Sequence, residues 1–228
     1  MTKNSSQIVS LKESTTREKV LKKVRNALIE PSDNYFKDID MDSSVYAPMQ
    51  EEPDVQFAYE LTASGAKFIY CNSPFDMLNK VAALFAENNW NEACCNEELI
   101  KGLLDHAGIK NFKSRADSPF NQIAVTTCEC LIARTGSIVV SSAIDSGRKL
   151  PFTCDIHVVI AFTSQVVEDI KQAMDFIRNK YRQRLPSFLS IITGTSRCDD
   201  IEKVMVPSGL GAKEIYVFMA DENSTDNE

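Results

Sequence analysis

Hydrophobic residues recur at intervals of three and four positions in the segment that follows Thr15, and this spacing predicts an amphipathic helix. Thr15 and Glu18 have the spacing of a capping box, in which each side chain bonds the other residue's backbone N–H. The apolar positions of this helix are Val20, Leu21, Val24, Ala27 and Leu28. A polar, proline-containing stretch follows and is interpreted as an extended linker. Residues 1–53 are therefore predicted to form an N-terminal helix and linker.

From residue 54 onward, short apolar runs alternate with segments of helical spacing. Ser73 and Pro74 have the pattern of a helix start, and residues 165–182 are predicted to form a longer helix. Strands are expected at residues 67–71, 123–132, 137–141, 155–162, 188–192 and 214–219. This alternation predicts an α/β fold with a mostly parallel, doubly wound sheet over residues 54–220. The polar residues 221–228 are expected to be a disordered acidic tail.

Ligands of doubly wound sheets bind beyond the carboxyl ends of the strands. The turns after Ile132, Phe162 and Ile192 are therefore the places where a site is expected.

Composition narrows the classes of protein. The chain has 228 residues with a net charge of −7, so a basic face for nucleic acid is not expected. No apolar run reaches the roughly 18 residues that a membrane span needs, and the N-terminus lacks a signal-peptide core. A cytoplasmic protein is the resulting expectation. The seven cysteines contain no Cys-x-x-Cys pair, so we expect free thiols and no metal or iron–sulfur cluster on this chain.

The most distinctive segment is an apolar strand that runs into Thr193, Gly194, Thr195, Ser196 and Arg197. A glycine here would let backbone N–H groups approach an anion, while hydroxyls and a guanidinium complete the contact. The alternative is an ordinary strand-to-helix connection in which Ser196 is the N-cap of a short helix.

A second turn of the same composition contains Thr135, Gly136 and Ser137 between two apolar stretches. It is a further candidate for ligand binding. The alternative is a β-hairpin in which Gly136 occupies a position of positive φ.

Candidate acid–base groups are few. Asp155 and His157 would share one side of a strand, where a carboxylate could tune an imidazole base. Asp199 and Glu129 are further candidates, whereas a histidine in a core strand also has a purely structural explanation. A divalent ion near Asp199, Asp200 and Glu202 is left open by the sequence.

These motifs together resemble the lactate-utilization protein C family, whose common unit is the LUD domain. The resemblance rests on residues 133–140, on Gly147 and Arg148, and on residues 155–160, 165–167 and 192–202. It implies a fold similar to the group formed by ribose-5-phosphate isomerase, glucosamine-phosphate deaminase and CoA-transferase. It also implies a role in oxidising L-lactate beside iron–sulfur subunits, with the clusters on those partners. Arg148 joins the ligand-binding candidates through this resemblance.

The sequence departs from the family pattern at three places. Arg134 stands where a glutamate is usual, Thr195 where a proline is usual, and Leu210 where the family has a histidine. If that imidazole takes part in a reaction, this chain lacks it.

Three hypotheses follow. The first is an accessory component of lactate oxidation that binds a small anionic ligand. The second is a stand-alone enzyme acting on a phosphorylated or acyl-CoA-type substrate. The third is a structural interaction protein, with a homo-oligomer formed through the N-terminal helix.

Overall fold

The structure is a computed structural model. It describes residues 15–29, 38, 40, 46–106, 108–109, 112–113, 121–182, 184–199, 205–207 and 211–222. The chain divides into two units, Met1–Ala47 and Pro48–Glu228. Among the described helices, none is long and apolar enough to cross a bilayer.

The first unit contains the helix α1 (Thr16–Ile29), and the predicted capping box is confirmed. The Thr15 N–H donates to Glu18 Oε2 at 2.8 Å, and the Glu18 N–H donates to Thr15 Oγ1 at 3.3 Å. No residue of α1 is buried, so the described residues of the first unit leave its apolar stripe uncovered.

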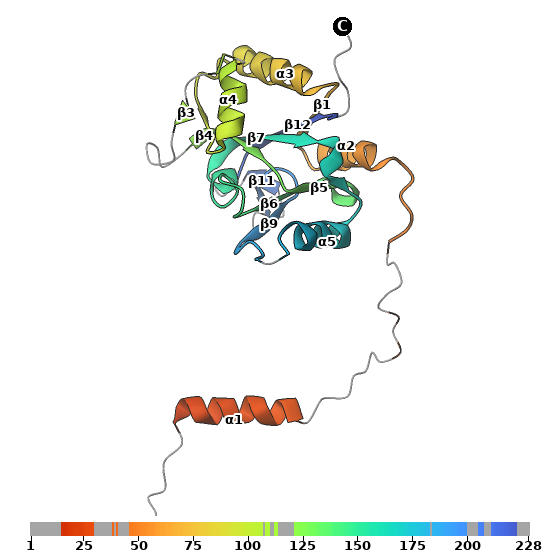
Figure 1. The fold of residues 1–228 in the computed structure, drawn as a ribbon, viewed down its shortest axis with the longest axis vertical. Helices are drawn as coiled ribbons and strands as arrows, with labels where there is room; N and C mark the ends of the chain where they lie inside the picture. The colour runs from red at the N-terminus through yellow and green to blue at the C-terminus, as the bar shows by residue number, and fades with distance from the viewer. Residues whose placement is uncertain are drawn as a thin grey trace, which may run out of the picture. The chain divides into compact units, whose positions relative to one another are not determined.

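The second unit is built on a parallel six-stranded sheet with the order β1-β12-β7-β4-β2-β3 (Figure 1). The predicted mostly parallel α/β architecture is confirmed. Its strands are β1 (Lys67–Cys71), β2 (Ala93–Cys94), β3 (Phe112–Lys113), β4 (Asn121–Thr127), β7 (Cys154–Phe162) and β12 (Glu214–Ala220).

A second, four-stranded sheet with the order β8-β5-β6-β9 packs against the first. Its strands are β5 (Cys130–Ile132), β6 (Ser137–Ser141), β8 (Val166–Val167) and β9 (Leu189–Ile192). The single strand expected over residues 123–132 is therefore two strands, because the chain leaves the large sheet after Thr127 and enters the small one at Cys130. Gln165 holds this crossing point, since its Nε2 donates to the Cys128 carbonyl at 2.8 Å.

The two sheets and the helices form four layers (Figure 1). Helices α3 (Pro74–Glu87) and α4 (Glu98–His106) cover one face of the large sheet, where Met77, Val81 and Leu104 meet Val158 and Phe218. The doubly wound arrangement predicts helices on the other face as well. That face is instead covered by the small sheet and α2 (Pro53–Ala63), and α5 (Ile170–Lys180) packs on the far side of the small sheet.

Local signals explain where two helices begin. Ser73 caps α3 as predicted, because its hydroxyl accepts the Asp76 N–H at 3.1 Å. The helix expected from residue 165 starts later, since the Asp169 carboxylate caps α5 by accepting the Gln172 N–H at 2.9 Å. The residues before it form a 3-10 turn (Thr163–Gln165) and then β8, which pairs with β5.

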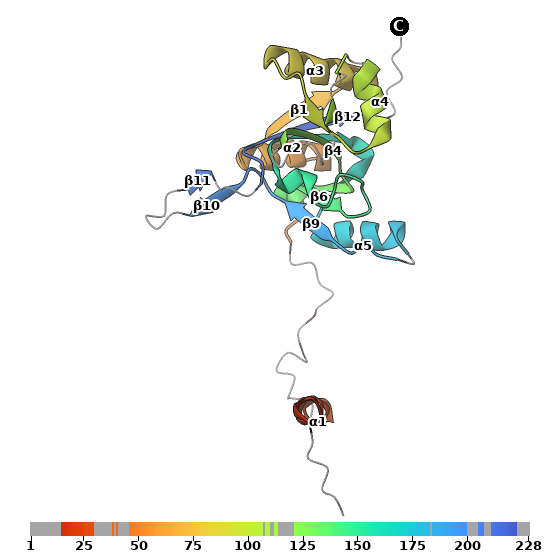
Figure 2. The ribbon, with the colours of Figure 1, turned by 90° about the vertical axis from the view of Figure 1, so that its left-hand side faces the viewer.

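The segment after Ser196 is a strand. β10 (Arg197–Asp199) pairs antiparallel with β11 (Met205–Pro207), and the two lie side by side at one edge of the body (Figure 2). The alternative in which Ser196 caps a helix is therefore wrong, because the backbone of residues 197–199 forms a ladder with β11.

Candidate functional site

The two threonine–glycine turns meet at one end of the small sheet. β5 and β9 both run antiparallel to β6, which lies between them. The carboxyl ends of β5 and β9 therefore lie at the same end of the small sheet. Ile132 pairs with Ser137, and Ile138 pairs with Ile192. The turns after Ile132 and Ile192 therefore lie together at one end of the small sheet, whereas the sequence placed them, with the turn after Phe162, at the carboxyl ends of a parallel sheet.

A chain of hydroxyl groups joins the two turns. Thr135 Oγ1 lies 2.7 Å from Ser137 Oγ, and Ser137 Oγ lies 2.7 Å from Thr193 Oγ1. Ser137 is buried, whereas both threonines are exposed. The turn at Gly136 follows a short 3-10 helix (Ala133–Thr135) and has the positive φ, +58°, expected of the hairpin alternative.

Both glycines face the C-terminal turn of α2. A Cβ atom on Gly136 would lie 2.2 Å from the Leu61 backbone nitrogen, and one on Gly194 would lie 2.5 Å from the Ser64 carbonyl oxygen. Each position therefore needs a glycine because protein backbone approaches it closely. The C-terminus of a helix carries partial negative charge, so this side of the turns does not attract an anion.

A pocket of about 180 Å³ opens beside the second turn. Its lining combines the backbone and hydroxyl of the turn with apolar side chains: Pro151, Phe152, Ile191, Ile192, Gly194, Ser196, Gly211, Ala212 and Ile215. The wall is fixed by the Ser196 N–H, which donates to the Ala212 carbonyl at 2.8 Å. The Gly211 N–H donates to the Phe152 carbonyl at 3.2 Å. Thr195 lies in the chain between Gly194 and Ser196, which line this pocket, and is half-buried.

The two predicted guanidinium groups occupy different situations. Arg197 begins β10, and its side chain lies outside the described residues. Arg148 is exposed and donates to Ser187 Oγ at 2.8 Å, and it is not among the residues that line the pocket. The side chains of Asp199, Asp200 and Glu202, where the sequence leaves a divalent ion open, lie outside the described side chains, as does the departure at Leu210.

The acid–base candidates do not form the predicted pair. His157 is fully buried in β7, and its Nε2 lies 2.8 Å from Thr126 Oγ1 rather than from Asp155. Burial lowers the pKa of His157 to about 4, which leaves the imidazole neutral at physiological pH. Asp155 instead forms an ion pair with Lys213 at 2.7 Å. The structural explanation of this histidine fits these contacts.

Glu129 has partners that the sequence did not reveal. Its carboxylate is fully buried and accepts hydrogen bonds from Ser141 Oγ, from Lys180 Nζ at 2.7 Å and from the Tyr181 hydroxyl at 2.8 Å. Burial and the bond to Glu129 raise the pKa of Tyr181. The only sequence signal was an acid inside an apolar run, which indicates burial but not the partners at the end of α5.

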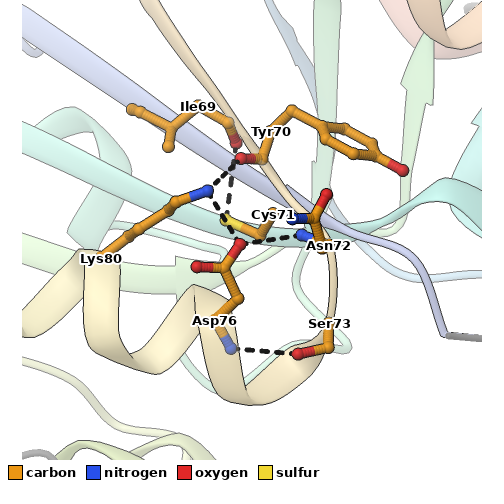
Figure 3. Close-up of polar contacts among 7 residues, drawn as sticks. All are labelled: Ile69, Tyr70, Cys71, Asn72, Ser73, Asp76 and Lys80. Carbon is orange, nitrogen blue, oxygen red and sulfur yellow. Dashed lines mark hydrogen bonds and ion pairs between the residues drawn. The ribbon is translucent and has the colours of Figure 1, made fainter. Parts of the chain in front are cut away.

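A second polar cluster lies where β1 meets α3 (Figure 3). Lys80 Nζ lies 2.8 Å from Asp76 Oδ2 and donates to the Tyr70 carbonyl at 2.9 Å. Asp76 also accepts the Asn72 N–H at 2.9 Å. The lysine thus covers a carbonyl of the edge strand, a common protection against edge-to-edge pairing. Its charge is balanced by Asp76, and the cluster is explained by helix capping and edge protection.

The six cysteine thiols that the structure describes are buried. Burial raises the pKa of Cys71 to about 11 and those of Cys95, Cys130 and Cys154 to about 12. A thiol with a raised pKa is a poor nucleophile at neutral pH. Among the residues that the structure describes, no group of three or more His, Cys, Asp or Glu side chains is placed to hold a metal ion.

Comparison with known proteins relates the second half of the chain to a known domain. The sequence pattern of the LUD domain matches residues 110–219. This segment is similar to the LUD domain, in agreement with the motifs in the second half of the chain. It contains both threonine–glycine turns and the strands that carry them.

Curated relatives agree with this assignment. Lactate utilization protein C of Bacillus subtilis is 30% identical over 117 residues, which cover 50% of this chain and 48% of that protein. Lactate utilization protein C of Deinococcus radiodurans is 27% identical over 51% of this chain and 50% of that protein. The uncharacterized protein YkgG of Escherichia coli is 27% identical over 44% of this chain and 45% of that protein. The aligned part spans about half the length of these relatives.

A solved structure shows the same fold. The crystal structure of a duf162 family protein from Deinococcus radiodurans superimposes with a TM-score of 0.57 at 17% identity. The match covers 74% of this chain and 96% of that one. At this identity the likeness concerns the fold alone.

Proposed function

We propose that this protein is an accessory component of L-lactate oxidation and that it binds a small anionic ligand in the pocket beside Gly194 and Ser196. The observation that carries the proposal is the meeting of the two threonine–glycine turns, joined through Ser137 and Thr193, within the segment that is similar to the LUD domain. The naming of the similar proteins from Bacillus subtilis and Deinococcus radiodurans supplies the physiological context.

The size of the pocket favours a small guest. Sites for drug-sized ligands typically enclose about 300–1,000 Å³, whereas this pocket encloses about 180 Å³. A carboxylate of a few carbon atoms suits that space better than an acyl-CoA or a nucleotide does. The apolar walls would hold the methyl end of such a ligand. The Ser196 hydroxyl and the Arg197 guanidinium are proposed to meet the carboxylate.

Iron–sulfur subunits are the proposed partners, and they would carry the clusters of the system. The cysteine spacing supports this division, because the sequence contains no Cys-x-x-Cys pair of the kind that holds such clusters.

The ligand site is tested by thermal shift and calorimetry with L-lactate, pyruvate, inorganic phosphate and a sugar phosphate. A ligand that binds only the folded protein raises its melting temperature as concentration passes Kd. Ile191→Phe should fill the pocket and abolish the shift, since Ile191 lines it and is partly exposed. Ile170→Phe is the matched control, because Ile170 is also exposed but lies outside the lining.

Arg197→Ala should likewise abolish binding of the carboxylates. Equal shifts in the parent, Ile191→Phe and Arg197→Ala proteins would refute the site. Stabilisation by the sugar phosphate alone would favour the stand-alone enzyme instead.

The physiological role has its own test. Deletion of the gene should abolish growth on L-lactate, and the tagged protein should co-purify with iron–sulfur subunits. Normal growth of the deletion strain would contradict the role even if a ligand binds.

A further inference from the structure

Helix α1 presents two chemically distinct faces and no buried residue. Val20, Val24 and Leu28 repeat every four residues and lie on one side, with Leu21 and Ala27 beside them. At 100° per residue, Lys23 and Arg25 flank this stripe on its two sides, and Lys19 and Lys22 fall on the opposite side. A helix of 14 residues is marginal in water without packing of its apolar face. A partner surface is therefore needed to cover that face.

The charge on α1 restricts what that partner is. The helix has five basic residues and one acid, so pairing of two α1 helices brings like charges together. An anionic membrane is disfavoured for two reasons. The helix lacks the aromatic residues that anchor interfacial helices, and the chain as a whole has a net charge of −7. An apolar surface rimmed with acids is the complement that remains.

The outer face of α2 has this character. Val55 and Tyr59 lie one turn apart and are 52% and 72% exposed. A shallow groove of about 380 Å³ runs between Glu51, Val55, Gln56 and Tyr59. Residues 51–63 contain four acids, Glu51, Glu52, Asp54 and Glu60, and no lysine or arginine. The inner face of α2 is already packed through Phe57 and Leu61, so only the outer stripe is available.

We infer that α1 of one copy of this chain docks on the outer stripe of α2 of a second copy, with the exchange made in both directions. The aliphatic stripe of α1 covers Val55 and Tyr59, and Lys23 and Arg25, which flank the stripe, face the acidic rim. The same two surfaces are used twice, as a closed two-fold dimer requires. The linker permits this exchange, because the 23 residues between Ile29 and Pro53 span up to about 75 Å when extended.

The mass of the full-length protein, measured by light scattering and sedimentation equilibrium, tests the inference. The parent should form dimers that weaken as salt rises, because part of the attraction is between exposed charges. Leu28→Asp and Tyr59→Asp should each raise the dimer dissociation constant about tenfold or more. Both side chains are exposed, so neither change disturbs the core. Phe75→Asp is the matched control, since Phe75 is 63% exposed on α3 and should leave the mass unchanged.

Mixing the variants separates exchange from other modes of pairing. The Leu28→Asp variant keeps the outer stripe of α2 unchanged, and the Tyr59→Asp variant keeps the apolar stripe of α1 unchanged. Their mixture should form heterodimers through one intact contact, although each variant alone is monomeric. Charge reversal by Lys23→Glu with Arg25→Glu should also weaken the dimer, and Glu51→Lys with Glu52→Lys should restore it.

Three results would overturn the inference. They are a monomeric parent at every concentration, a dimer unaffected by Tyr59→Asp, and failure of the two variants to associate when mixed. Co-sedimentation of the parent with vesicles of phosphatidylglycerol, lost in Leu28→Asp, would assign α1 to a membrane surface instead. None of these measurements depends on lactate binding.

Discussion

Ser137 and Thr193 are 56 positions apart in the chain, yet their hydroxyl groups share a hydrogen bond of 2.7 Å. The bond closes the edge of the small sheet between the start of β6 and the end of β9. It makes the two threonine–glycine turns one structural unit, so a change in either turn is expected to affect the other.

This unit can be measured by a double-mutant cycle. Ser137→Ala and Thr193→Val should each lower the free energy of unfolding by about 1 kcal/mol, a usual value for one hydrogen bond. Because each change removes the same bond, the double variant should lose less than the two single losses added together. Urea unfolding of the four proteins measures the coupling. Strict additivity would show that the bond contributes nothing.

Substitution of three glycines by alanine should change the stability of the fold by very different amounts. Gly136→Ala should destabilise the fold by more than about 3 kcal/mol, because its Cβ would meet the Leu61 backbone at 2.2 Å. Gly108→Ala has open space but a φ of +86°, so a loss of about 1 kcal/mol is expected. Gly102→Ala lies within α4 with nothing near its Cβ and should gain up to about 1 kcal/mol. Denaturant midpoints of the three variants check the order, and an equal loss in all would contradict it.

Lys180→Met should cost about 3 kcal/mol of stability. Its removal leaves the fully buried Glu129 carboxylate without its cation, although Ser141 and Tyr181 still donate to it. Lys80→Met is the matched control, because the ion pair of Lys80 with Asp76 is partly exposed and should contribute less than about 1 kcal/mol. Similar losses in both variants would show that burial of Glu129 does not set the energy of its pair.

Acid should destabilise the protein through His157. Burial lowers the pKa of His157 from 6.5 to about 4, so its contribution of about 3 kcal/mol is complete above pH 6.5. The contribution is lost as pH falls from 6.5 towards 4, because the unfolded chain takes up the proton first. Urea unfolding between pH 7.5 and 4 should show this slope in the parent.

The slope should be absent in His157→Gln. His106→Gln, which changes the only other histidine of the sequence, should retain it. An unchanged slope in His157→Gln would assign the acid sensitivity to other groups.

Local chemistry made several features predictable. The capping pairs at Thr15 and Ser73 and the positive φ at Gly136 depend on neighbouring residues, and the sequence indicates each of them. The division of residues 123–132 into β4 and β5 was not predictable. A continuous apolar run has the same hydrophobic pattern whether it forms one strand or is divided between two sheets. For the same reason, the hydrophobic spacing of Val166 and Val167 favoured a helix where pairing with β5 makes a strand.

The candidate site was predictable only in part. Two turns of matching composition indicated a common location, and the ladder of the small sheet brings them together. Contacts between residues far apart in the chain could not be predicted from the sequence. The sequence gives no sign that α2 fills the space beside Gly136 and Gly194, or that Lys180 and Tyr181 reach Glu129.

The strand order also has a consequence for how the protein is made. β12 is the last of the described strands and lies between β1 and β7, and β1 has no other neighbour among those strands. While the ribosome is still translating the chain, β1 therefore has no strand to pair with, and one edge of β7 stays open. The large sheet closes only after residues 214–220 emerge, so the nascent chain exposes aggregation-prone edges until that point of translation.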